Sequence, residues 1–150
     1  PKLYSGRGLP PFTISHIPYI SLGQSTSIKA ALASPSLNPK DLGRAGQGVG
    51  SCIFLLADQP QIPVEVIRAL TEANARDLTP LLAPLVLEER RANPVLFDRA
   101  AFPHLLQLSG DVGGRAIFDK FRVSYLPLHD DILFFDVDKP EDYERLKGLE

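Results

Sequence analysis

A carboxylate directly follows six apolar residues in the stretch Cys52-Ile53-Phe54-Leu55-Leu56-Ala57-Asp58-Gln59-Pro60. Because Gly50-Ser51 precedes the run and prolines follow it, the run predicts a strand covered on both faces, as in the centre of a parallel sheet. Asp58 would then lie at the carboxyl edge of the sheet, where α/β proteins usually bind ligands. The alternative is that Asp58 only caps the following turn or helix, and this stretch alone does not decide between the two.

A second apolar run, Ile132-Leu133-Phe134-Phe135, also ends in acidic residues, Asp136-Val137-Asp138. In an extended chain Asp136 and Asp138 project to the same face. If this run is a strand parallel to the first, all three carboxylates reach one edge, where Mg²⁺ commonly binds one or two carboxylates together with substrate phosphates. We therefore predict Asp58, Asp136 and Asp138 as metal ligands for phosphoryl or nucleotidyl transfer. Asp138 is an equally good candidate for the cap of the final helix.

Hydrophobic spacing and turn residues predict further helices and strands between and around these runs. Pro84 removes a hydrogen-bond donor from one predicted strand, which should therefore lie at the sheet edge or carry a bulge. Helices are expected from near Ser25 or Ser27, from Pro63 to about Arg76, from Arg99 to Leu108 behind an Asp98 cap, and from Tyr143 to about Leu149; strands are expected at Leu81–Leu87, Val123–Leu128 and Ile132–Val137.

A glycine-rich turn, Ser109-Gly110-Asp111-Val112-Gly113-Gly114-Arg115, leads into Ala116-Ile117-Phe118. Arg115 is expected in the first turn of a helix, where backbone N–H groups attract anions. No Gly-Lys-Ser/Thr follows, so the turn is not a phosphate-loop motif. On local grounds the favoured interpretation is that Asp111 caps a helix and the glycines only turn the chain.

Length and composition are typical of one ordinary soluble domain of 150 residues. A net charge of −2 provides no basic field for a nucleic-acid polymer, although a small anionic ligand is compatible with it. No apolar stretch approaches the roughly 20 residues that cross a bilayer. Cys52 is the only cysteine, so no internal disulfide can form, and a cytoplasmic setting is expected.

Five segments, taken in chain order, resemble the successive motifs of the nucleotidyltransferases that mature the molybdenum cofactor, of the cytidylyltransferase type. The resemblance extends from about Gly23 to the C-terminus. The segments are Gly23–Leu32 (GQSTSIKAAL), Leu55–Pro60 (LLADQP), Asn93–Phe97 (NPVLF), Ser109–Arg115 (SGDVGGR) and Asp136–Asp142 (DVDKPED).

This resemblance implies an α/β, three-layer, Rossmann-like fold of the nucleotide-diphospho-sugar transferase type, with a mostly parallel sheet. It implies a reaction in which CTP, or another nucleoside triphosphate, is coupled to the phosphate of molybdopterin with release of pyrophosphate, assisted by Mg²⁺. A molybdoenzyme or its chaperone is the protein partner that such a role suggests.

Carried over residue by residue, the resemblance makes Asp58 and Asp136 the catalytic acids and, with Asp138, the Mg²⁺ ligands. Other residues are implied to surround the substrates. Gly23, Ser25, Thr26 and Ser27 would lie by the nucleotide, whereas Asn93, Pro94, Gly110, Asp111, Gly113 and Arg115 would shape the pterin pocket. Within that pocket Arg115 would hold a phosphate, since its planar guanidinium suits two parallel hydrogen bonds.

The sequence departs from the family pattern near its start. The glycine-rich loop of the form L-A-A-G-x-S-x-R-M-G is missing, and Ser5-Gly6-Arg7-Gly8 follows no apolar strand that would make it a substitute. Ala92 replaces the usual glycine, and Lys139 the usual threonine. We therefore expect residues 1–150 to be an N-terminally incomplete domain that holds part of the site, and the missing phosphate-binding loop predicts that this segment is inactive alone. The alternatives are a glycosyltransferase that uses the Asp-Val-Asp triplet with a sugar nucleotide, and a binding module that no longer catalyses.

Overall fold

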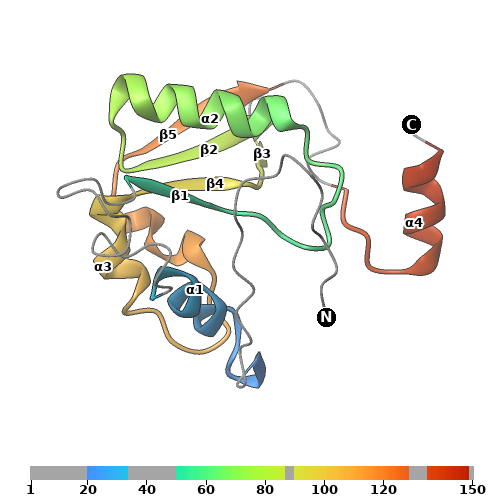
Figure 1. The fold of residues 1–150 in the computed structure, drawn as a ribbon, viewed down its shortest axis with the longest axis horizontal. Helices are drawn as coiled ribbons and strands as arrows, with labels where there is room; N and C mark the ends of the chain where they lie inside the picture. The colour runs from blue at the N-terminus through green and yellow to red at the C-terminus, as the bar shows by residue number, and fades with distance from the viewer. Residues whose placement is uncertain (1–19, 34–49, 87–89, 129–134, 149–150) are drawn as a thin grey trace, which may run out of the picture.

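Helices cover both faces of one central sheet (Figure 1). The computed structural model describes residues 20–33, 50–86, 90–128 and 135–148. Helix α2 lies on one face of the sheet, and α1 and α3 lie on the other, so the predicted three-layer α/β arrangement is confirmed. The strands are β1 (Ser51–Phe54), β2 (Leu81–Val86), β3 (Arg90–Arg91), β4 (Val95–Asp98) and β5 (Val123–Leu128); the α-helices are α1 (Gln24–Leu32), α2 (Val64–Asp77), α3 (Phe102–Leu105) and α4 (Pro140–Lys147).

The sheet is mixed rather than mostly parallel. Its order is β1-β4-β2-β3, with β5 also paired to β2. Only β2 and β5 pair in parallel, whereas the pairs of β1 with β4, β2 with β4, and β2 with β3 are antiparallel. The expectation of a mostly parallel sheet is therefore wrong for the described strands, although the α/β class itself is confirmed.

Strand β1 lies at one end of the described sheet, not at its centre. It pairs with β4 alone, in antiparallel register. Side chains of β1 still pack into both core clusters, with Cys52 and Phe54 on one face and Ile53 on the other. Cover on both faces explains the unbroken apolar pattern, which therefore cannot distinguish a central strand from an edge strand.

The apolar run continues beyond the end of β1. Leu55 is 60% exposed and Leu56 is 41% exposed, and Asp58 lies in the turn that follows. The predicted strand is therefore too long, and Asp58 stands beyond the strand's end instead of directly at it.

Strand β2 is an interior strand, so of the two alternatives that Pro84 predicted, an edge strand or a bulge, the edge strand is wrong, whereas pairing on one side of β2 is interrupted opposite Pro84. It pairs with β5 along its whole length on one side and with β4 and then β3 on the other. The carbonyl oxygen of Pro84 accepts a hydrogen bond from the Ala92 N–H at 3.0 Å, in the break between β3 and β4. The ring nitrogen of Pro84 faces the same side as this carbonyl, so the missing donor falls at the break.

Two apolar clusters form the core, one on each side of the sheet. Neighbouring residues of a strand contribute to opposite clusters, as Leu81 and Leu82 do on β2, and Leu96 and Phe97 on β4. The cluster beneath α1 and α3 contains Ile28, Leu81, Ala83, Val95, Phe97, Ala101, Leu105 and Ile117, and the cluster beneath α2 contains Val66, Leu70, Ala73, Leu82, Val86, Ala92 and Leu96.

Most predicted helices are present, with altered ends. Helix α2 follows Pro63, which occupies its N-cap position. Asp98 caps as predicted, because its Oδ1 accepts a hydrogen bond from the Ala100 N–H at 2.9 Å. The predicted helix behind it is shorter, however, and consists of the 3-10 helix η3 (Arg99–Ala101) and α3. Among the described residues, no helix is long and apolar enough to cross a membrane.

The segments near the C-terminus differ more from expectation. The glycine-rich turn leads into a 3-10 helix, η4 (Gly114–Lys120), and not into an α-helix. The predicted strand Ile132–Val137 lies partly outside the described residues, and residues 135–138 form no strand. Helix α4 stands apart from the sheet in Figure 1 and buries none of its residues.

Candidate functional site

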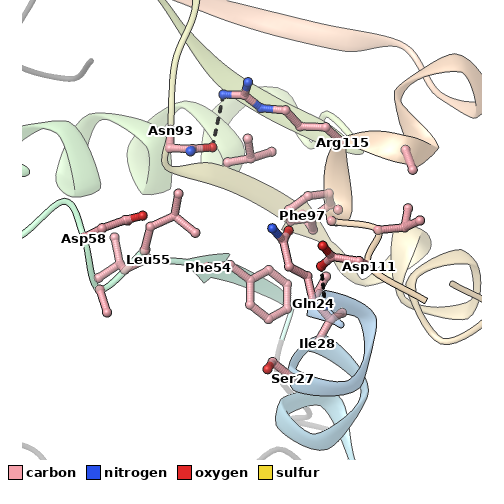
Figure 2. A pocket seen from close by; sticks show the side chains of 17 residues that line it. Gln24, Ser27, Ile28, Phe54, Leu55, Asp58, Asn93, Phe97, Asp111 and Arg115 are labelled. Carbon is pink, nitrogen blue, oxygen red and sulfur yellow. Dashed lines mark hydrogen bonds between the residues drawn. The ribbon is translucent and has the colours of Figure 1, made fainter. Parts of the chain in front are cut away.

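A cavity of about 850 Å³ opens between the start of α1, the residues after β1 and the segment that leads into η4. Figure 2 shows its side chains, with Asn93 and Arg115 on one side of the space and α1 on another. Four of the five segments that carry the sequence motifs contribute to the lining. The polar lining residues are Gln24, Ser27, Asp58, Asn93, Asp111 and Arg115, and the larger apolar ones are Ile28, Phe54, Leu55, Leu56, Val95 and Phe97.

The start of α1 is joined to the glycine-rich turn by what we call the helix junction, formed by Gly23, Gln24, Ser25, Gly110 and Asp111. The backbone N–H of Gln24 donates to Oδ1 of Asp111 at 3.2 Å, as Figure 2 shows. The Ser25 hydroxyl donates to the Gly110 carbonyl oxygen at 2.7 Å. Asp111 is thus a cap, as the local interpretation holds, but for a helix 87 residues away in the chain.

Glycine is required at position 23 by this junction. Gly23 has φ 92° and ψ 179°, a conformation that is essentially restricted to glycine. A Cβ atom at this position would lie 2.4 Å from the Asp111 Cα and 2.5 Å from its backbone nitrogen. The two main chains can therefore approach only because residue 23 lacks a side chain.

The predicted hydroxyl loop is divided between the junction and the cavity. Ser25 is only 3% exposed and bonds to Gly110. Among the described residues that line the cavity, Ser27 is present, whereas Ser25 and Thr26 are absent. Ser27 is therefore the hydroxyl of this loop that a ligand in the cavity would meet.

Asn93 and Arg115 are joined by a hydrogen bond near the start of η4. The Nη2 of Arg115 donates to Oδ1 of Asn93 at 3.1 Å, and the Asn93–Pro94 peptide bond is cis. Pro94 itself is fully buried, so it supports Asn93 without contributing to the lining. The predicted pocket residues thus meet, and Gly113 and Asp111 line the same space.

Two aromatic rings form the apolar floor of the cavity. Phe54 and Phe97 meet edge to face, with ring centroids 5.8 Å apart. A Cβ atom at Gly114 would lie 2.5 Å from Cζ of Phe97, so glycine allows η4 to begin directly over this ring. The floor suits a planar ring system, which gains contact area against aromatic side chains.

The two acidic segments also meet, through what we call the acid junction: Asp58, Gln59 and Gln61 against Phe135, Asp136 and Val137. The Val137 N–H donates to the Asp58 carbonyl oxygen at 2.8 Å. The Gln59 amide donates through Nε2 to Oδ1 of Asp136 at 2.6 Å, and Nε2 of Gln61 donates to the Phe135 carbonyl oxygen at 2.5 Å. The expected meeting of the acidic segments is confirmed, although strand ends do not produce it.

Neither acid serves the capping role that the sequence left open. Pro63 occupies the N-cap of α2, so Asp58 does not cap that helix. At α4 the backbone N–H groups of Lys139 and Asp138 both donate to Oδ2 of Asp142, at 3.1 and 3.3 Å. Asp142 therefore caps the last helix, and the alternative role of Asp138 as its cap is wrong.

The acid junction provides two carboxylates for a divalent cation. Asp58 lines the cavity and is exposed, and Asp136 is exposed beside it in the junction. The described residues contain no group of three or more His, Cys, Asp or Glu side chains placed to hold a metal ion. Two carboxylates are enough for Mg²⁺, which takes one or two carboxylates from a protein and fills its remaining positions with water and phosphate. The assignment of Asp58, Asp136 and Asp138 to a metal stays a prediction.

Sequence patterns did not single out three residues that the structure places at the site. Gln24 lines the cavity, and Gln59 and Gln61 form the acid junction. The only sequence signal for Gln59 is its position directly after Asp58. An isolated polar residue in a turn has no periodicity that could predict its burial or its partner.

Cys52 is a half-buried thiol that packs against the core cluster beneath α1 and α3. Burial raises the pKa of the Cys52 thiol to about 12. A thiol with that pKa carries almost no thiolate near neutral pH, so it is a poor nucleophile. The interpretation of Cys52 as a small core residue agrees with this shift.

The chain resembles a known protein family over most of its length. A family model described as "MobA-like NTP transferase domain" matches residues 3–125. No curated protein matches the chain. The four motif segments that line the cavity all lie within that range.

Solved structures of similar fold belong to longer chains than this one. Rv0371c of Mycobacterium tuberculosis, in complex with manganese, is 24% identical with a TM-score of 0.62, and the match covers 80% of this chain and 59% of that one. An Rv0371c homologue from Mycobacterium sp. strain JC1 is 24% identical with a TM-score of 0.63, covering 85% and 58%. Molybdopterin-guanine dinucleotide biosynthesis protein A of Archaeoglobus fulgidus is 22% identical with a TM-score of 0.57, covering 85% and 62%. The chain thus spans about 60% of the length of these structures, and the likeness shows the fold.

Proposed function

Because this chain belongs to the family of MobA-like NTP transferase domains, we propose that it takes part in transferring a nucleotidyl group to a molybdopterin-type acceptor, with release of pyrophosphate. One observation carries the proposal. The acid segment that contains Asp58 and the pocket segments that contain Asn93 and Arg115 line one cavity, although they are distant in sequence.

The acceptor would occupy the space over the aromatic floor. Phe54 and Phe97 suit the flat face of a pterin ring, and the Gln24 and Asn93 amides can donate to and accept from its polar edge. Arg115 would hold the acceptor's phosphate, since its planar guanidinium suits two parallel hydrogen bonds to phosphate oxygens.

The acid junction would hold the cation that assists the transfer. Asp58 and Asp136 are the proposed Mg²⁺ ligands, with Asp138 as a further candidate. Bound Mg²⁺ neutralises the charge that develops on phosphate oxygens during nucleotidyl transfer. Asp58 both lines the cavity and accepts the Val137 N–H through its own carbonyl oxygen, so its backbone position is fixed relative to the second acidic segment.

CTP is the triphosphate that the sequence motifs favour, and GTP is the competing one. The closest motif resemblance is to cytidylyltransferases, whereas the Archaeoglobus structure carries the name of a guanine dinucleotide protein. A cytoplasmic setting and delivery of the product to a molybdoenzyme or its chaperone belong to the same proposal.

The proposal is tested by Asp58→Asn in the full-length gene product. We expect Mg²⁺-dependent release of pyrophosphate from CTP plus molybdopterin to fall by at least a hundredfold, because a neutral amide binds the cation far more weakly. Asp119→Asn is the matched control, since Asp119 is an exposed carboxylate of η4 that does not line the cavity. Its turnover should equal that of the wild type, and circular dichroism should show the same fold for both variants.

Three other outcomes would contradict parts of the proposal. Unchanged turnover in Asp58→Asn would overturn the metal assignment. Hydrolysis of a sugar nucleotide without pyrophosphate release from CTP or GTP would favour a glycosyltransferase. Tight binding of molybdopterin without either activity in the full-length product would favour a binding module.

A further inference from the structure

Gln59 is a buried polar residue that contacts one of the proposed metal ligands. Its side chain is 7% exposed, and its Nε2 donates to Oδ1 of Asp136 at 2.6 Å across 77 residues of sequence. Its Oε1 is also buried and has no hydrogen-bond partner among the described residues. The hydrogen bond of this buried amide therefore goes to a carboxylate that is distant in sequence.

Attachment of the second acidic segment does not depend on Gln59. The Val137 N–H bonds to the Asp58 carbonyl oxygen, and Gln61 bonds to the Phe135 carbonyl oxygen, at 2.8 and 2.5 Å. These two bonds anchor the main chain on both sides of Asp136. Of these three hydrogen bonds of the acid junction, the Gln59 bond is the one that reaches a carboxylate. Its effect is therefore on the direction of that carboxylate.

We propose that Gln59 is a positioning residue, which orients the Asp136 carboxylate so that its other oxygen faces a divalent cation shared with Asp58. This inference rests on the proposed function. Carboxylates that bind metals are commonly held by a hydrogen bond from a neighbouring residue, and loss of such a partner typically weakens metal affinity by roughly 10–100-fold. Oδ1 of Asp136 is occupied by the amide, and Asp136 is exposed, which leaves its second oxygen accessible to solvent and ions.

The test uses Mn²⁺ alone as the probe, without nucleotide or acceptor. Gln59→Leu preserves the approximate volume and the burial of the side chain and removes the donor. We expect the dissociation constant of Mn²⁺, measured from the electron paramagnetic resonance signal of the free ion, to rise by about tenfold. If Gln59→Leu does not fold, Gln59→Met removes the same donor with an unbranched side chain. An unchanged dissociation constant in a folded variant would overturn the inference.

Asn74→Leu is the matched control. Asn74 is another buried amide, on α2, and its Nδ2 donates to the main-chain carbonyl oxygen of Thr79 at 3.2 Å, outside the acid junction. The dissociation constant of Mn²⁺ in this variant should stay within about twofold of the wild type. A loss equal to that of Gln59→Leu would mean that removing any buried amide weakens binding through the fold, and would overturn the positioning role.

A double-mutant cycle separates failure of this inference from failure of the proposed metal site. Asp136→Asn should weaken Mn²⁺ binding strongly, and adding Gln59→Leu to it should weaken binding no further, because the two residues act as one unit. If Asp136→Asn binds Mn²⁺ like the wild type, the proposed metal site fails and the inference fails with it. If Asp136→Asn weakens binding but Gln59→Leu does not, only the inference fails.

Discussion

The helix junction and the acid junction both bring together segments that are far apart in sequence, but they differ in how closely the main chains approach. In the helix junction two hydrogen bonds join segments whose main chains, at Gly23 and Asp111, lie so close that no Cβ fits between them, and Ser25 is buried beside them. In the acid junction the contacts are hydrogen bonds from two glutamine amides and one backbone N–H, and the acids remain exposed.

Because of this difference, the two junctions should control different properties of the site. A steric contact between main chains permits one arrangement, because closer approach is forbidden and separation opens a void. A hydrogen bond to an exposed carboxylate can be lost singly, and the segment remains attached through the others. The helix junction should therefore fix the form of the cavity, whereas the acid junction should set the direction of the acids at its edge.

Gly23→Ala should cause the largest loss of stability. The new Cβ would meet the Asp111 main chain at 2.4 Å, and alanine would also be strained at φ 92°. We expect the free energy of unfolding in urea to fall by roughly 2–4 kcal/mol, as the sum of backbone strain and steric overlap.

Variants at two other glycines separate the effect of backbone strain from the effect of steric overlap. Gly110 has φ 73° but open space around a Cβ, so Gly110→Ala should cost only the conformational term of about 1 kcal/mol. Gly50 has neither a positive φ nor a neighbour within 4 Å, so Gly50→Ala should change stability by less than about 0.5 kcal/mol. Equal losses in all three variants would refute the steric description of the helix junction.

Removing two carboxylates that accept from helix N-termini compares the helix junction with α4, and smaller losses are expected. Asp111→Ala removes the acceptor of the Gln24 N–H and should lower the free energy of unfolding by about 1 kcal/mol. Asp142→Ala removes the acceptor of the Lys139 and Asp138 N–H groups. Because α4 buries no residue, its loss should fray α4 locally and leave global unfolding almost unchanged.

Hydrogen exchange resolves the two effects by residue. Faster exchange should be confined to residues 138–147 in Asp142→Ala, and should reach α1 and the core beneath it in Asp111→Ala. A global loss of stability in Asp142→Ala would show that α4 is part of the cooperative unit, and the contrast between the helix junction and α4 would not hold.

Local patterns predicted the elements of the fold better than their places in it. Val123–Leu128 forms β5 with the predicted bounds, and α2 begins after Pro63 as expected. Strand β1 was misplaced because cover on both faces produces the same apolar run at an edge as at the centre. The place of β2 stayed open between an edge and a bulge because the effect of Pro84 depends on where its partner strand breaks, which no local pattern encodes.

The candidate site likewise contains residues that local motifs predicted and residues whose roles depend on distant partners. Asp58, Asn93, Asp111, Gly113 and Arg115 were predicted as site residues, and all five line one cavity. Their motifs carry residue types that suit ligand binding, so sequence alone could select them. Long-range contacts selected the rest: Ser25 is in the helix junction and not in the cavity lining, and Gln59 gains its role only from a partner 77 residues away.

The reactivity of Cys52 provides a sensitive comparison of the helix junction with α4. Its thiol packs against the cluster that contains Ile28 of α1. Burial raises its pKa from 9.0 to about 12, so the thiolate fraction at pH 8 is roughly a thousandfold lower than in an unfolded chain. Reaction with a disulfide reagent should therefore be slow at pH 8 and accelerate as pH rises toward 12. Gly23→Ala, which loosens the cover that α1 provides, should accelerate it at constant pH in proportion to the population of opened molecules. Asp142→Ala should not, and equal acceleration in both variants would mean that the helix junction does not protect the thiol.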